Sequence, residues 1–134
     1  MIPDRLLPEA TIEIVVTPEM RAAFDGEVIH EVYGTASMVG HMELAARHVI
    51  LAAREEHEEG IGYRVEATHI APAPVGSRVT VTARLRGVDG NRVTCAVEAS
   101  TRRGVIGRGL VVQVILPRET LRRRFEEYGS QGTL

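Results

Sequence analysis

The sequence predicts an α+β domain in which an antiparallel sheet wraps around one long helix. A helical spacing of apolar residues runs from Thr35 to about Arg54, and a two-residue alternation then dominates the chain up to Leu116. Residues typical of turns separate the alternating runs. A long helix followed by a series of strands indicates a helix packed on one face of an antiparallel sheet.

The segment before the helix contains one predicted strand and one irregular stretch. Residues Thr11 to Thr17 are rich in β-branched side chains and are followed by Pro18, which predicts a first strand. Residues 18–34 mix chain breakers with apolar residues. We expect them to form a loop with at most one short helical turn.

The predicted helix begins at Thr35, whose hydroxyl is expected to cap the helix N-terminus. The opposite end is marked by the charged run from Arg54 to Glu59 and then Gly60, and this run is most simply a solvated helix end. Between these limits, apolar residues recur at spacings of three and four. They are Met38, Val39, Met42, Ala45, Ala46, Val49, Ile50 and Ala53.

Four strands joined as a meander are predicted after the helix. A proline-rich turn at 71–76 ends the first of them, and Asp89-Gly90-Asn91 is typical of a hairpin turn between the second and third. The last strand is apolar on both faces in its second half, so we expect both of its faces to be covered. The expected ranges are 63–71, 79–86, 92–99 and 105–116, followed by a short helix with Leu121, Phe125 and Tyr128 on one side.

A curled sheet around one helix is the hot-dog architecture, and we expect residues 1–134 to form a single domain of this fold. One layer of sheet leaves two strand edges open, and a second copy of the chain would cover them. We therefore expect a homodimer or a dimer of dimers.

Composition argues against several classes of function. The chain has 16 basic and 18 acidic residues and a net charge of −2, without the basic excess of nucleic-acid-binding proteins. It has no run of the ~20 apolar residues that a membrane span needs. Its single cysteine, Cys95, lies on the apolar face of a strand and is expected to be buried. We expect a cytoplasmic protein with no nucleic acid or membrane partner, no metal and no cofactor.

Three polar residues are candidates for chemistry, and position alone leaves a structural alternative open for each. Thr35 is either a helix cap or a hydroxyl that orients a water or a carbonyl. Glu43 is either a surface partner of Arg47 or a general base or nucleophile at the edge of the apolar stripe. His69 is either a core histidine or a functional residue at a strand end.

The segment from Val32 to Glu43, VYGTASMVGHME, resembles the helix-start motif of the fluoroacetyl-CoA thioesterase-like hot-dog proteins. The segment from Gly62 to His69 with the turn APAPVG after it, the hairpin VDGNR at 88–92 and the segment IGRG at 106–109 are similar to the same family. The resemblance runs from about Ile14 to Leu116.

This resemblance implies a dimeric acyl-CoA thioesterase that acts at a subunit interface. It matches Thr35, Glu43 and His69 to the catalytic residues of the family, and Gly62 to a glycine that lines the acyl-thioester site. Glu43 would attack the thioester or activate water, His69 would handle protons, and Thr35 would position the reacting groups. The reaction implied is hydrolysis of a small or medium acyl-CoA to free acid and CoA.

Two departures from the family bear on the acyl group. Gln113 stands where the fluoroacetyl-specific enzyme carries a substrate-contacting arginine. The segment from Phe24 to Val32 is shorter than the aromatic lid of that enzyme, and Ile29 stands roughly where a gating phenylalanine would be. The resemblance therefore predicts the reaction and not the substrate. Two alternatives stay open on the same fold, a non-catalytic acyl-CoA binding or sensing protein and a hydratase or dehydratase.

Overall fold

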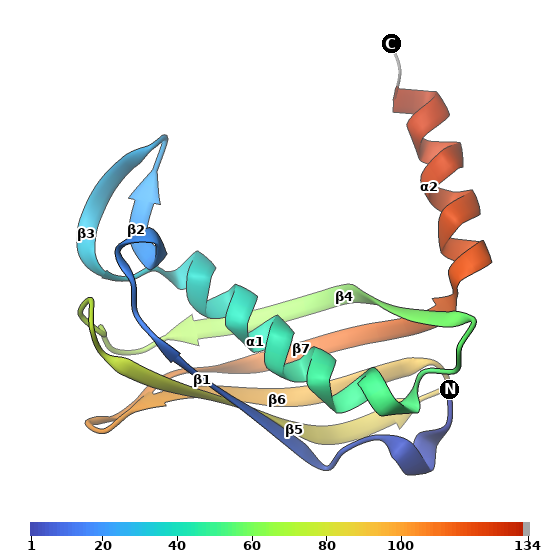
Figure 1. Cartoon of the computed structure of the whole chain (residues 1–134), viewed down its shortest axis with the longest axis horizontal. Coiled ribbons are helices and arrows are strands. Elements are labelled where there is room, and N and C mark those ends of the chain that lie inside the picture. Colours follow the sequence, from blue (N-terminus) through green and yellow to red (C-terminus); the bar gives the residue numbers. More distant parts are fainter. Residues whose placement is uncertain (133–134) are drawn as a thin grey trace.

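An antiparallel sheet of five strands lies against one long helix in the computed structural model, which describes residues 1–132 and the side chains of residues 1–129 (Figure 1). The helix is α1 (Thr35–Ile50), continued by the short turn η3 (Leu51–Ala53). The strands stand in the order β1-β5-β6-β7-β4. Their bounds are β1 (Glu9–Val15), β4 (Glu58–His69), β5 (Arg78–Asp89), β6 (Arg92–Thr101) and β7 (Gly104–Pro117). The predicted α+β architecture is confirmed.

Helix α1 packs through the stripe that its residue spacing predicts. The buried residues are spaced by three and four, and each predicted stripe residue from Met38 to Ile50 is buried except Val39, which is half-buried. Alternate residues of β5, β6 and β7 complete the core on the sheet side. Cys95 is one of them: its side chain is fully buried, as predicted, and burial raises the pKa of its thiol to about 11.

The predicted meander is wrong at its first step. Strand β4 pairs with β7 rather than with β5, and β1 takes the place next to β5. Only β5, β6 and β7 follow one another as a meander. The alternation of side chains predicts which face of a strand is buried, but it does not state which strand lies beside it. The consequence is that β4 forms an open edge of the sheet.

Residues 18–34 are more ordered than predicted. They form the turn η2 (Pro18–Met20) and a hairpin of β2 (Arg21–Phe24) and β3 (Glu27–Tyr33), which projects beyond the β4 edge in Figure 1. Asp25 and Gly26 make the tight turn with φ values of 54° and 76°. The hairpin register shifts twice and most of its side chains are exposed. For this reason the sequence carries no regular alternation here.

Other element limits also differ from the prediction. Strand β4 begins at Glu58, so the charged run that was expected to end the helix belongs partly to a strand. The outer side chains of β7 are half-buried, so its second face is only partly covered within one chain. Helix α2 (Arg118–Gly132) is long rather than short, and of its predicted apolar face only Leu121 is buried. Within residues 1–132, no helix combines the length and apolar character that crossing a membrane requires.

Candidate active site

Thr35 and His69 lie in contact at one end of the sheet. The Thr35 hydroxyl and Nδ1 of His69 are 2.8 Å apart. The predicted capping role of Thr35 is wrong, because Gly34 is the N-cap residue and no side chain caps the helix. A Cβ atom on residue 34 would lie 3.1 Å from Cα of Ala22, so the N-cap position favours glycine. The Thr35 hydroxyl is therefore free to bind the histidine.

Backbone hydrogen bonds tie the segments that carry this pair. The amide of Tyr33 donates to the carbonyl of Ala73 at 2.8 Å, and the amide of Ile70 donates to the carbonyl of Ile106 at 2.7 Å. Gly107 pairs with His69 across the sheet, and a Cβ atom there would overlap Sδ of Met38. The helix start therefore packs closely on β7, beside the end of β4.

Among the described residues, only one of the two nitrogens of the His69 imidazole is hydrogen-bonded, namely Nδ1, which contacts Thr35. The other nitrogen, Nε2, is buried and has no hydrogen-bond partner in the described part of the chain. Leaving such a group unpaired costs ~1–3 kcal/mol. The edge of the ring contacts Tyr33, with ring centroids 6.3 Å apart and an angle of 80°. His69 therefore differs from a core histidine whose two nitrogens are both hydrogen-bonded.

Tyr33, which contacts the His69 ring, is itself bound to His41. Their rings stack with centroids 5.8 Å apart, and the Tyr33 hydroxyl is hydrogen-bonded to Nδ1 of His41. Burial raises the pKa of Tyr33 and lowers the pKa of His41, so both groups favour their neutral forms. A cavity of about 300 Å³ opens in front of this cluster, and Thr35, Tyr33 and His69 line it. Residue spacing alone had not singled out Tyr33 or His41.

Glu43 lies in a different cleft, between α1 and the β4–β7 edge of the sheet. The cleft has a volume of about 340 Å³. A Cβ atom on Gly62 would lie 3.2 Å from Oε2 of Glu43, so the glycine makes room for the carboxylate. Glu43 is exposed and forms no hydrogen bond or ion pair with any described residue. The residues that line the cleft are Gly40, Glu43, Leu44, Arg47, Gly60, Gly62, Val111 and Gln113.

The four predicted site residues form two separate pairs within one chain. Thr35 and Glu43 are eight residues apart on α1, a rise of about 12 Å at 1.5 Å per residue. They line different cavities that share no residue. The structure therefore brings Thr35 to His69 and Glu43 to Gly62, but it does not bring the two pairs together.

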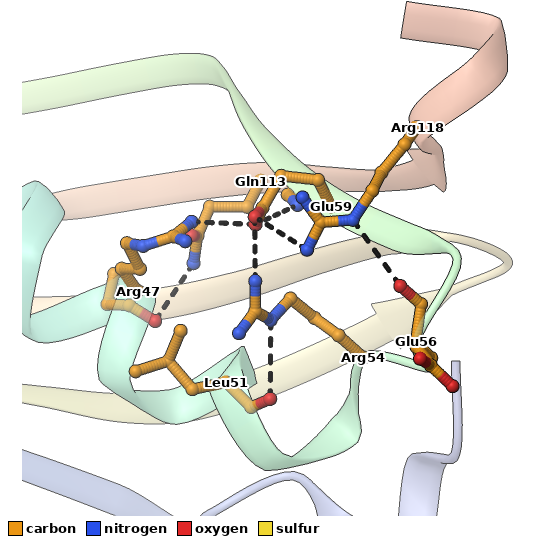
Figure 2. A network of polar contacts seen from close by, with 9 residues as sticks. Arg47, Leu51, Arg54, Glu56, Glu59, Gln113 and Arg118 are labelled. Carbon is orange, nitrogen blue, oxygen red and sulfur yellow. Dashed lines mark hydrogen bonds and ion pairs between the residues drawn. The ribbon is translucent and has the colours of Figure 1, made fainter.

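Arg47 does not form the predicted surface pair with Glu43, because it binds Glu59 instead. Figure 2 shows the Glu59 carboxylate surrounded by three guanidinium groups, those of Arg47, Arg54 and Arg118. The N–O distances are 3.0, 2.7 and 3.5 Å respectively. Hydrogen bonding by Arg47, the largest cause, lowers the pKa of Glu59 to about 2. We call these four residues the Glu59 cluster.

Removal of the Glu59 charge is expected to destabilise the protein in a pH-dependent manner. A carboxylate whose pKa falls from 4.5 to about 2 on folding stabilises the fold above pH 4.5, and that stabilisation is lost as the pH falls toward 2. The Glu59→Gln variant should therefore have a lower Tm than the parent at pH 7, and the difference should shrink below pH 4.5. Glu119→Gln is the matched control, since Glu119 binds two exposed arginines and such pairs contribute little. Equal effects of both substitutions at pH 7 would contradict this role.

The charged run also contains a local group with metal-ligand spacing. Among the described residues, ligand atoms of Glu55, His57 and Glu58 lie within 4.8 Å of one another. Both carboxylates also bind the terminal ammonium group of Met1. The ammonium group of Met1 therefore already forms ion pairs with these two carboxylates.

Comparison with known proteins places the chain in a family. The sequence model of the fluoroacetyl-CoA-specific thioesterases matches residues 16–119. The fluoroacetyl-CoA thioesterase of Streptantibioticus cattleyicolor is 34% identical over 102 residues, which are 76% of this chain and 73% of that protein. The chain belongs to this thioesterase family.

Solved structures support the same assignment. A Thermus thermophilus hypothetical protein, described as a thioesterase superfamily member, is 47% identical with a TM-score of 0.88, over 92% of this chain and 91% of that one. A hot-dog-like protein from Thermanaerovibrio acidaminovorans is 25% identical with a TM-score of 0.87, over 96% and 97% of the two chains. The predicted hot-dog fold and the predicted family are therefore confirmed.

Proposed function

We propose that this protein is an acyl-CoA thioesterase that hydrolyses a small or medium acyl-CoA to the free acid and CoA. The observation that carries the proposal is the Glu43 carboxylate, which has no partner among the described residues and lies in a cleft that three glycines help to line. Membership of a thioesterase family supports it. The direct test is thiol release from a panel of acyl-CoAs by the purified protein. Absence of turnover with every member of the panel would refute the proposal.

The chemistry of the two residue pairs suits thioester hydrolysis. Glu43 would take a proton from water that attacks the carbonyl carbon, or would attack that carbon itself. In both routes the bond between the carbonyl carbon and sulfur breaks, and the thiolate takes up a proton that water ultimately supplies. In the second route, water also hydrolyses the anhydride that Glu43 forms with the acyl group. His69 would supply or accept protons through Nε2, while Thr35 holds its Nδ1 side. Gly62 would leave space for the thioester beside Glu43.

We propose that a second copy of the chain joins the two pairs. Strand β4 is a sheet edge, and its residues 62–68 are all exposed, with the Tyr63 side chain 58% accessible. Open strand edges favour pairing with another strand. An antiparallel pairing of this stretch with itself is centred on its midpoint, residue 65. Gly62 of one copy would then lie opposite residue 68 of the other, next to His69 of that second copy.

Mixing two inactive variants tests this shared site. The Glu43→Gln chain keeps its native His69, and the His69→Asn chain keeps its native Glu43. In a dimer of these two chains, one of the two shared sites therefore contains both native residues, and the other contains neither. Random reassembly of equal amounts should therefore restore about a quarter of the parental activity per chain. If each chain carries a complete site by itself, mixing restores nothing. Each variant alone and each variant mixed with itself provide the baseline, and sedimentation measures the oligomeric state.

One alternative has its own supporting observation. Because the two residue pairs line separate cavities in a single chain, the cleft could hold an acyl-CoA without hydrolysing it. The protein would then be a non-catalytic acyl-CoA binding or sensing protein. Tight binding of acyl-CoA in calorimetry with no release of thiol would favour this alternative. We also propose a single-domain, homodimeric protein located in the cytoplasm.

A further inference from the structure

The cleft beside Glu43 contains a second charged group. Among the described residues that line it, Arg47 is the only cation and Glu43 is the only anion. The two residues are four apart on α1, so their Cβ atoms are separated by about 6 Å along the helix. They do not neutralise one another, because Arg47 turns to Glu59.

Arg47 retains hydrogen-bonding capacity for a ligand. A guanidinium carries five N–H donors, and one of them, on Nη1, donates to Glu59. Glu59 is shared with Arg54 and Arg118, so the Glu59 cluster has three positive charges for one negative charge. The Arg47 side chain is 39% exposed. An acyl-borne anion in the cleft would therefore meet a cation that Glu59 holds in place and neutralises only in part.

Apart from Glu43 and Arg47, the described residues that line the cleft carry no charge. The Gln113 side chain is buried, and its amide donates to the carbonyl of Ala46 at 2.9 Å, which keeps it against the helix (Figure 2). Leu44 and Val111 add apolar surface to the lining of the cleft. Gly60 has no side chain that would fill the space near Gln113. This arrangement suits a short apolar chain with an anion at its far end.

The small volume of the cleft, about 340 Å³, limits which anion can reach Arg47. Glu43 and Arg47 are about one helical turn apart, so an acyl chain with two or three methylene groups suits a thioester beside Glu43 and a carboxylate on Arg47. The phosphates of CoA are separated from the thioester by the whole pantetheine arm, which is several times longer. An acyl-borne carboxylate therefore fits the position of Arg47 better than a phosphate of CoA.

We propose that Arg47 is a specificity residue that selects acyl-CoAs whose short acyl chain ends in a carboxylate. This inference rests on the proposed function, because it takes the Glu43 cleft as the site of hydrolysis. The acyl carboxylate binds the guanidinium of Arg47, and the thioester carbonyl lies beside Glu43. The methylene groups between them contact Leu44 and Val111.

Matched pairs of substrates test the proposal. Succinyl-CoA and butyryl-CoA have the same chain length and differ in the terminal carboxylate, as do glutaryl-CoA and valeryl-CoA. The parental protein should favour the carboxylate member in kcat/KM by at least about tenfold, as expected for a hydrogen bond between charged groups. The Arg47→Gln variant should lose that preference, so that its kcat/KM values for the two members of each pair lie within about threefold of one another.

A matched variant separates recognition from structure. Arg54→Gln removes one guanidinium from the same Glu59 carboxylate, but Arg54 does not line the cleft. It should leave the ratio of succinyl-CoA to butyryl-CoA hydrolysis unchanged within about threefold. Equal loss of the ratio in both variants would overturn a direct contact with Arg47. It would assign the effect to the Glu59 cluster as a whole.

Truncated substrates distinguish the two sources of negative charge. The succinyl and butyryl thioesters of pantetheine lack the phosphates of CoA, so the Arg47-dependent preference should persist with them. A preference that exists only with the CoA thioesters would overturn the proposal and assign Arg47 to the phosphates. Hydrolysis of all substrates without a preference would overturn it but leave the proposed function standing. Hydrolysis of none would refute the proposed function itself.

Discussion

The Glu43→Gln substitution is expected to lower the kcat of acyl-CoA hydrolysis by about 10²–10⁴-fold, the usual contribution of a general base or acid. Glutamine has nearly the shape of glutamate, so the space beside Gly62 stays filled as before. It can neither accept a proton from water nor attack the thioester. Because the carboxylate has no partner among the described residues, its removal leaves no buried charge behind. The fold should therefore be unaffected.

Thiol release under saturating acyl-CoA measures this loss, and calorimetry should show that the variant still binds the substrate. Glu13→Gln is the control, since Glu13 is an exposed carboxylate on β1, at the opposite edge of the sheet. The control should keep parental activity. If Glu43→Gln retains kcat within about threefold of the parent, Glu43 has no part in the chemistry.

The Gly109→Ala substitution is expected to cost about 3 kcal/mol or more of the free energy of unfolding. A Cβ atom at this position would lie 1.8 Å from the carbonyl oxygen of Glu66 and 3.0 Å from Cα of Ala67. Both contacts are with backbone atoms of β4, which is paired to β7 at this point. Backbone cannot rotate aside as the end of a side chain can. The two strands must separate locally, two residues before His69.

Urea unfolding measures the loss, and two other glycines provide a graded comparison. Gly87→Ala, in β5, meets no atom within 4 Å and should leave the stability nearly unchanged. Gly107→Ala meets the flexible end of Met38 and should have an intermediate effect. The same midpoint for Gly109→Ala and Gly87→Ala would contradict the close approach of β4 and β7.

Helix α1 and its buried stripe could be predicted because both are local properties. A helix places residues three and four apart on one face, so the spacing of its apolar residues already states which face is buried. The alternation in β5, β6 and β7 is equally local, and the glycine turn at Gly90 announces the hairpin between β5 and β6. The β2–β3 hairpin has a turn signal in Asp25-Gly26 but lacks the alternation, because most of its side chains are exposed and its register is irregular.

The sequence could predict only part of the candidate site. Motif positions predicted four site residues: Thr35, Glu43, His69 and Gly62. The structure places Thr35 in contact with His69 and Glu43 beside Gly62. The role of Thr35 as a cap was a reasonable inference from its position. It fails because the approach of Ala22, thirteen residues earlier, favours a glycine as the N-cap.

The sequence by itself determined helix α1 and its buried face, the strands β5, β6 and β7, and the family to which the chain belongs. The tertiary structure decided the neighbour of β4, the division of the four site residues into two pairs and the turn of Arg47 toward Glu59. The difference has one physical cause. Propensity and spacing act between residues close in the chain, whereas strand order and ion pairs depend on which distant segments share the same core.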